Sequence, residues 1–337
     1  MIISRIVQCV DTHSCGEPTR VVLGGIPKVS GKTMKEKYAY FKSNLDDLRT
    51  ALFQEPRGFD NMLGVFVLEP VHQRADFGVI YASATQYFEM CGDSTFSVTK
   101  ALIETGMIEA IEPVTKIRLD TYGGIVEVEA QVKNGVVGDI TYQSVPTFFL
   151  KTTAFNVPNL GKVTADIAFG GLWYAFIDAH AVKVDITLKN MKRIFALGMS
   201  LLEEVNKQVE VCHPLDRSLN TISLVTFFEK NPKKGIDYKI VNIYGDNASC
   251  RSPAGTMSAA CIATCFAKGE VKVGQQIVLE NGWIGSQHRA KVVEETKVGD
   301  QPAIIPALTA TAYLTGLHQA ILDSEDPYRY GFLLTEA

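Results

Sequence analysis

Two stretches of small and polar residues could each place reactive groups at the start of a helix. The first runs from Cys91 and Gly92 through Asp93 to Ser94, and an apolar stripe follows it up to Gly106. The N-terminus of a helix carries N–H groups without an acceptor in the helix, and a partial positive charge. Such a position binds carboxylates and lowers the pKa of a cysteine. The Cys91 thiol is therefore a candidate base or nucleophile, and a buried structural cysteine is the alternative.

The second stretch repeats the first in composition and spacing. It starts at Ala254 and ends at Gly269, the same separation as between Cys91 and Gly106. Glycine commonly follows the last residue of a helix. Strand-like runs rich in Val and Ile lie on both sides of each stretch. The repeat indicates two similar α/β halves, each with one central helix, and coincidence between two ordinary buried helices is the alternative.

Two further helices are expected from the apolar spacing. Residues 33–53 carry apolar side chains at helical intervals and end before a Pro-Gly segment, and residues 190–211 form a long amphipathic pattern. The pattern of strands restarts near residue 146. These elements have to position the two helix starts.

Composition excludes several classes of function. The chain has 337 residues, 46% of them hydrophobic, and a formal net charge of −4. It has no basic field for nucleic acid and no apolar run of the roughly 18 residues that span a membrane. The polar N-terminal stretch does not resemble a signal peptide, and an odd count of 7 cysteines argues against a disulfide framework. We expect a cytoplasmic protein that binds neither nucleic acid nor membranes.

Six short motifs follow one another along the chain, at residues 11–20, 55–58, 90–92, 168–171, 251–256 and 326–332. Residues 90–92 resemble the MCGH motif of the proline racemase family, and residues 251–256 resemble its DRSPCGTG motif. The similarity extends over residues 3–334 in the same order, with few gaps. The family includes 4-hydroxyproline 2-epimerases and trans-3-hydroxy-L-proline dehydratases.

The resemblance implies a diaminopimelate epimerase-like fold of the α/β (α+β) class. Two pseudo-symmetric halves would each wrap a curved, mostly antiparallel sheet around a central helix. We expect residues 1–145 with 312–337 to form the half that carries Cys91. Residues 146–311 would form the half that carries the 250–256 loop and its helix. The family also implies a homodimer that uses no cofactor and no metal, so His13 and His213 are expected to be structural.

The resemblance further implies that the chain removes the α-proton of proline or a hydroxyproline. Cys91 as thiolate would take the proton on one face, and a thiol on the other face would return one. The developing carbanion needs hydrogen bonds in a dry site. The expected donors to the substrate carboxylate are the backbone N–H groups of Gly92, Asp93, Gly255 and Thr256.

Three positions differ from the family pattern, and all lie in the catalytic motifs. Ala254 stands where racemases and epimerases have a second cysteine, so it cannot donate a proton. Cys250 stands where they have aspartate, and it is either the replacement thiol or a buried loop residue. Asp93 stands where histidine is usual. It could bind the substrate ammonium group, at the cost of disfavouring the Cys91 thiolate, or simply favour the helix start.

Three hypotheses follow. The first is a racemase or 2-epimerase that uses Cys91 and Cys250. The second is a one-base dehydratase, which the loss of the second thiol favours, although the family's dehydratases keep a hydroxyl group where Ala254 stands. The third is an inactive protein that binds an imino acid. Exchange of the α-proton with deuterium from solvent distinguishes a binder from either enzyme.

Pocket residues are assigned by the same resemblance. Leu63 and Tyr244 match positions of apolar pocket walls in the family, and the Ser94 hydroxyl lies in the first motif. Trp173 and Tyr174 follow a Gly-Gly pair and are candidates for the same wall, with a place in the core as the alternative.

Overall fold

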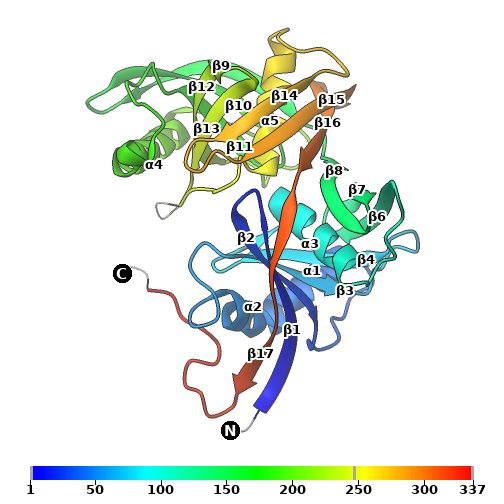
Figure 1. Cartoon of the computed structure of the whole chain (residues 1–337). Coiled ribbons are helices and arrows are strands. Elements are labelled where there is room, and N and C mark those ends of the chain that lie inside the picture. Colours follow the sequence, from blue (N-terminus) through cyan, green and yellow to red (C-terminus); the bar gives the residue numbers. More distant parts are fainter. Residues whose placement is uncertain (1–2, 246–247, 335–337) are drawn as a thin grey trace. The chain divides into compact units, whose positions relative to one another are not determined.

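The chain forms two compact units (Figure 1). The computed structural model describes residues 3–245 and 248–334. One unit consists of residues 1–142 with 311–337, and the other consists of residues 143–310.

Among its described residues, the first unit contains three helices and the first and last strands of the chain. The first and last of these strands pair in antiparallel fashion over most of their length. Its elements are β1 (Ile3–Ser14), β2 (Glu17–Gly24), α1 (Met34–Asn44), α2 (Asp46–Phe53), β3 (Leu63–Leu68), β4 (Phe77–Ser83), β5 (Tyr87–Phe88), α3 (Gly92–Glu104), β6 (Val114–Thr121), β7 (Gly124–Lys133), β8 (Val136–Gln143) and β17 (Ala312–Asp323).

The second unit is continuous in sequence. Its elements are β9 (Phe148–Val157), β10 (Gly161–Phe169), β11 (Trp173–Asp178), the 3₁₀ turn η1 (Leu188–Asn190), α4 (Met191–Gln208), β12 (Ile222–Lys233), β13 (Ile236–Ile243), α5 (Gly255–Ala267), β14 (Gln276–Asn281), β15 (Gln287–Val298) and β16 (Gln301–Ala310).

The two units have the same succession of parallel and antiparallel strand pairs. In the first unit the ladder is β17-β1-β2-β3-β4-β6-β7-β8, and in the second it is β9 to β16 in chain order. Two pairs in each ladder are parallel, and the other pairs are antiparallel. The parallel pairs are β2–β3 and β4–β6 in the first unit, and β11–β12 and β13–β14 in the second. The central helix, α3 or α5, precedes the strand that forms the second parallel pair. The two units therefore have the same topology.

Each sheet packs helices on both faces. In the first unit Phe66 of β3 packs against Phe41 of α1, with ring centroids 4.4 Å apart, while Tyr81 of β4 bonds to α3. In the second unit the buried face of α4 joins an apolar cluster with Trp173. Helices α3 and α5 are buried over nearly their whole length, which explains their small residues.

The predicted helix ends are confirmed for α3 and α5, and one predicted helix is wrong. Gly106 and Gly269 follow the two helices with φ of 76° and 73°, the left-handed conformation that glycine adopts without strain. The single helix expected over 33–53 is instead α1 and α2, because the chain leaves helical geometry at Leu45. Acidic residues in the first turn of α2 favour a new helix start there. No helix within residues 3–245 and 248–334 combines the length and apolarity of a membrane span.

Gly170 tests the close approach of the β10–β11 turn to α5. A Cβ atom at this position would lie 2.2 Å from the Thr256 carbonyl oxygen, so the backbone would have to move. We expect G170A to lower the free energy of unfolding by about 1–3 kcal/mol or more. Urea denaturation measures the change. G316A is the matched control, because a Cβ atom there meets nothing within 4 Å. Equal midpoints for the two variants would contradict the packing described here.

Candidate active site

Cys91 is the N-cap residue of α3. Its backbone is extended, with φ −142° and ψ 114°. Its carbonyl oxygen accepts hydrogen bonds from the N–H of Thr95 at 3.0 Å and from the Thr95 hydroxyl at 2.8 Å. Because that hydroxyl has only one proton to donate, Tyr81 must donate the 2.8 Å bond between the Tyr81 and Thr95 oxygens. Strand β4 thus fixes the helix start that carries the thiol.

The Cys91 thiol is neutral at physiological pH. Burial is the largest cause that raises its pKa to about 12, and the charge of Asp93 is the second. Hydrogen bonds from the side chain and backbone of Ser94 lower this pKa, and the charge of Glu17 raises it again. The N–H of Ser94 at the helix start lowers the pKa of Cys91, as expected, but burial and the carboxylates outweigh it, so the pKa is raised overall.

Glu17 is a residue of the site that the sequence analysis did not single out, although it lies within the 11–20 motif. It begins β2 directly after a two-residue turn in which Cys15 and Gly16 have φ of 49° and 87°. Its side chain is buried, as is that of Asp93 in the first turn of α3. The first unit thus places two buried carboxylates around one thiol.

Ala254 occupies the same place in α5 that Cys91 occupies in α3. It is the N-cap residue, and its carbonyl oxygen accepts from the Ser258 N–H at 3.0 Å and the Ser258 hydroxyl at 2.8 Å. Ser258 therefore corresponds to Thr95. Gly255 and Thr256 form the first turn, as Gly92 and Asp93 do in α3.

The backbone at Ala254 is strained. Its φ of 63° and ψ of 130° lie where residues with a Cβ atom are rare. Hydrogen bonds hold the preceding loop: the Ser252 hydroxyl accepts from the Ala254 N–H at 2.9 Å. Asn242 Nδ2 donates to the Pro253 carbonyl oxygen at 3.3 Å. The strain is supported by buried polar contacts, as at many functional sites.

Cys250 lies in the same loop and is partly exposed. Its carbonyl oxygen and that of Ser252 each accept a 3.0 Å hydrogen bond from Nδ2 of Asn281. The sequence analysis missed Asn281 and Asn242, which are both fully buried. An asparagine within or at the end of an apolar strand was the available signal.

The expected pocket-wall residues divide into two groups. Leu63 begins β3 and Tyr244 follows β13, and both are partly exposed. Trp173 is a core residue, since it is buried and donates to the Leu219 carbonyl oxygen at 2.9 Å. The Tyr174 hydroxyl lies 2.6 Å from that of Thr256, so a hydrogen bond from β11 holds the first turn of α5.

His13 and His213, the two histidines that we expected to be structural, make local contacts. His13 Nδ1 accepts a 3.2 Å hydrogen bond from the Gly16 N–H in the β1–β2 turn. His213 Nδ1 accepts from the Leu215 N–H at 3.3 Å, and its ring lies 4.6 Å from that of Phe169. Burial lowers the pKa of His213.

Each unit offers a different set of groups. The first has a thiol at a helix N-cap and two buried carboxylates, which suit a base and a cationic ligand group. The second has the first-turn amides of α5 and a thiol in the preceding loop. Amides at a helix start suit a carboxylate.

Known proteins match the chain over nearly its whole length. The family model described as proline racemase matches residues 9–333. Proline racemase from Clostridioides difficile is 38% identical over 335 residues, which cover 99% of this chain and 100% of the relative. The 4-hydroxyproline 2-epimerase from Streptosporangium roseum is 37% identical, covering 98% and 99%. The trans-3-hydroxy-L-proline dehydratase from Bacillus cereus is 34% identical, covering 99% and 100%.

Solved structures agree with the predicted diaminopimelate epimerase-like fold. A hydroxyproline epimerase from Agrobacterium vitis, with bound trans-4-hydroxy-L-proline, has a TM-score of 0.89 at 32% identity and covers 100% of this chain and 98% of its own. A PhzF-family phenazine biosynthesis protein from Bacillus anthracis has a TM-score of 0.60 at 12% identity, covering 94% and 99%, and shares the fold alone. From the family match and the identities to its relatives, the chain belongs to the proline racemase family.

Proposed function

We propose that the chain is a cofactor-independent isomerase that inverts Cα of proline or a hydroxyproline, with Cys91 as the base. The observation that carries the proposal is the thiol at the N-cap of buried α3, beside two carboxylates. Relatives named proline racemase and 4-hydroxyproline 2-epimerase support the reaction class.

The substrate itself supplies a positive charge, which favours the thiolate form of Cys91. A secondary ammonium group that binds beside Asp93 offsets the negative charge that raises the pKa of Cys91. With its pKa lowered, the Cys91 thiol first loses its proton to solvent, and the resulting thiolate then takes the α-proton and becomes a thiol. The electron pair of the C–H bond spreads into the substrate carboxyl group. The Cys250 thiol returns a proton to the opposite face, and its sulfur is left as thiolate for the reverse reaction.

In this proposal the substrate carboxylate binds to first-turn amides at a helix start. Gly92 and Asp93 offer such N–H groups in α3, and Gly255 and Thr256 offer them in α5. Their dipoles stabilise the negative charge that develops on the carboxyl group as the proton leaves. Ser94 lowers the pKa of Cys91, and Tyr174 hydrogen-bonds to the Thr256 hydroxyl. Leu63 and Tyr244 would form the apolar wall.

A dehydratase is the second candidate, because the N-cap of α5 is Ala254. With one base, Cys91 removes the α-proton and the 3-hydroxyl group leaves as water, so that a cyclic enamine forms and becomes an imine. The relative from Bacillus cereus is named for this reaction.

Incubation in D₂O with L-proline, 4-hydroxyproline and trans-3-hydroxy-L-proline in turn tests the reaction. We expect α-deuterium with inverted configuration from proline or 4-hydroxyproline, measured by NMR and chiral chromatography. C91A should lower the rate by at least about 10²-fold, because a positioned base is lost. C212A, which removes an exposed thiol, is the control. Imine from the 3-hydroxy compound alone would replace the proposal with the dehydratase, and no exchange at all would indicate a binding protein.

The role of Cys250 is tested by moving the second thiol. C250A should abolish inversion while α-proton exchange continues on the face that Cys91 attacks. Adding A254C to that variant should restore part of the inversion, because a residue with a Cβ atom already adopts this backbone and the change adds one sulfur atom. Unchanged inversion in C250A, measured by polarimetry, would contradict the role of Cys250.

The pKa of Cys91 can be tested without substrate. Its alkylation rate by iodoacetamide, followed by peptide mass spectrometry, should rise about tenfold per pH unit through pH 9 without a plateau, because the pKa is about 12. D93N removes a negative charge, so the thiolate fraction and the rate should increase at every pH below that pKa. D47N, which changes an exposed first-turn aspartate of α2, is the control. A plateau near neutral pH in the wild type would contradict the assignment.

A further inference from the structure

Four successive residues of the loop before α5, residues 249–252, are bonded to the turn that joins β14 to β15. Nε1 of Trp283 donates a hydrogen bond to the Ser249 hydroxyl oxygen at 2.7 Å. The hydroxyl of Ser286 donates to the Arg251 carbonyl oxygen at 3.1 Å. The carbonyl oxygens of the other two residues accept the bonds from the buried asparagine at the start of this turn. One short turn therefore holds the loop on both sides of its thiol.

The turn has hydrogen bonds of its own that fix its shape. The Asn281 N–H donates to the Ser286 carbonyl oxygen at 2.8 Å, and the Gly285 N–H donates to the Asn281 carbonyl oxygen at 2.9 Å. Oδ1 of Asn281 accepts from the Trp283 N–H at 2.9 Å. Because the amide oxygen faces the turn, the amide nitrogen faces the loop and donates its two protons there.

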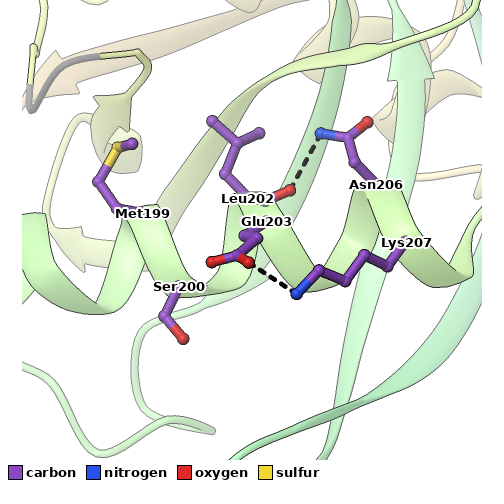
Figure 2. A pocket seen from close by; sticks show the side chains of 6 residues that line it. All are labelled: Met199, Ser200, Leu202, Glu203, Asn206 and Lys207. Carbon is purple, nitrogen blue, oxygen red and sulfur yellow. Dashed lines mark hydrogen bonds and ion pairs between the residues drawn. The ribbon is translucent and has the colours of Figure 1, made fainter.

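The Trp283 ring packs against α4. It stacks on Phe195, with ring centroids 6.2 Å apart and ring planes inclined by 13°, and both rings pack against the apolar cluster of the second unit. Further along α4, the Asn206 side chain makes two 2.9 Å hydrogen bonds with the backbone of Ile222 in β12. It also donates to the Leu202 carbonyl oxygen at 3.0 Å (Figure 2). The indole is thus placed by a helix that is bonded to the sheet.

We propose that Trp283 is a positioning residue for the Cys250 thiol, an inference that rests on the proposed function. Ser249 is buried and adjacent to Cys250, so the bond from the indole N–H restrains the backbone from which the thiol projects. A group that returns a proton has to lie within hydrogen-bond reach of the carbon, and a displacement of about 1 Å can lower a rate by about 10²-fold. Cys91 is held by other bonds, so its step does not depend on Trp283.

The variant W283F tests this role in D₂O with L-proline or 4-hydroxyproline. Phenylalanine keeps a ring beside α4 but has no N–H group for Ser249. We expect inversion to slow by about tenfold or more, while α-proton exchange at Cys91 stays within about twofold of the wild type. W173F is the matched control, because Trp173 also donates one indole hydrogen bond, to Leu219 in the core. It should leave the ratio of inversion to exchange unchanged even where it lowers stability.

The variant S249A removes the other partner of the same hydrogen bond. It deletes a single hydroxyl group, so it tests the inference even if W283F folds poorly. The two single variants should slow inversion to the same extent within about threefold. The double variant W283F/S249A should be no slower than the slower single variant, because all three lack the same bond. Additive losses in the double variant would contradict a role through this bond.

Hydrogen–deuterium exchange of the backbone amides of residues 249–252, followed by mass spectrometry, measures the loop without substrate and should be faster in W283F. Unchanged amide exchange, unchanged inversion, or an equal loss of inversion and α-proton exchange in W283F would overturn the inference. If C250A lost inversion while W283F kept it, the proposed function would stand without this role of Trp283. If C250A also kept inversion, or the wild type did not invert, the proposed function would fall and the inference with it.

Discussion

The position of one poorly solvated thiol beside two buried carboxylates, at the start of α3, is the constraint on which the proposed chemistry depends. Cys91 is held at the helix start by the bonds of Thr95 and Tyr81, and the charge of Asp93 adds to burial in keeping it protonated. A neutral thiol resists oxidation and alkylation better than a thiolate. In the proposed reaction the cationic nitrogen of the substrate offsets the charge of Asp93, so that the thiolate forms more readily when the substrate is bound.

The second unit repeats this frame with different chemistry. Its N-cap position has no thiol, and the backbone of Ala254 is strained and supported by Ser252 and two buried asparagines. Such supports hold the amides of Gly255 and Thr256 in place before a ligand arrives, which avoids the cost of ordering them during the reaction. The same loop carries Cys250, whose backbone carbonyl group is held by Asn281 in the network that supports the helix start.

Local sequence signals predicted much of this arrangement. The start and end of α3 and α5 followed from small residues and from Gly106 and Gly269, because helix ends depend on neighbouring residues. The break at Leu45 was missed, since the apolar spacing continues through it. The raised pKa of Cys91 was predicted only in part, through Asp93. Burial, its largest cause, depends on the packing of the whole unit, and the smaller contribution of Glu17 comes from far away in sequence. Asn281 reaches the Cys250 loop from another strand, a contact that no local pattern indicates.

The central claim is that the ammonium group of the substrate lowers the pKa of Cys91. The most direct measurement is the pH titration of the Cys91 ¹³Cβ resonance in cysteine-labelled protein, assigned with C91S. The account predicts a lower pKa with saturating L-proline than with tetrahydrofuran-2-carboxylate, which has the same ring and carboxylate but no ammonium group. Equal pKa values with the two ligands would contradict it.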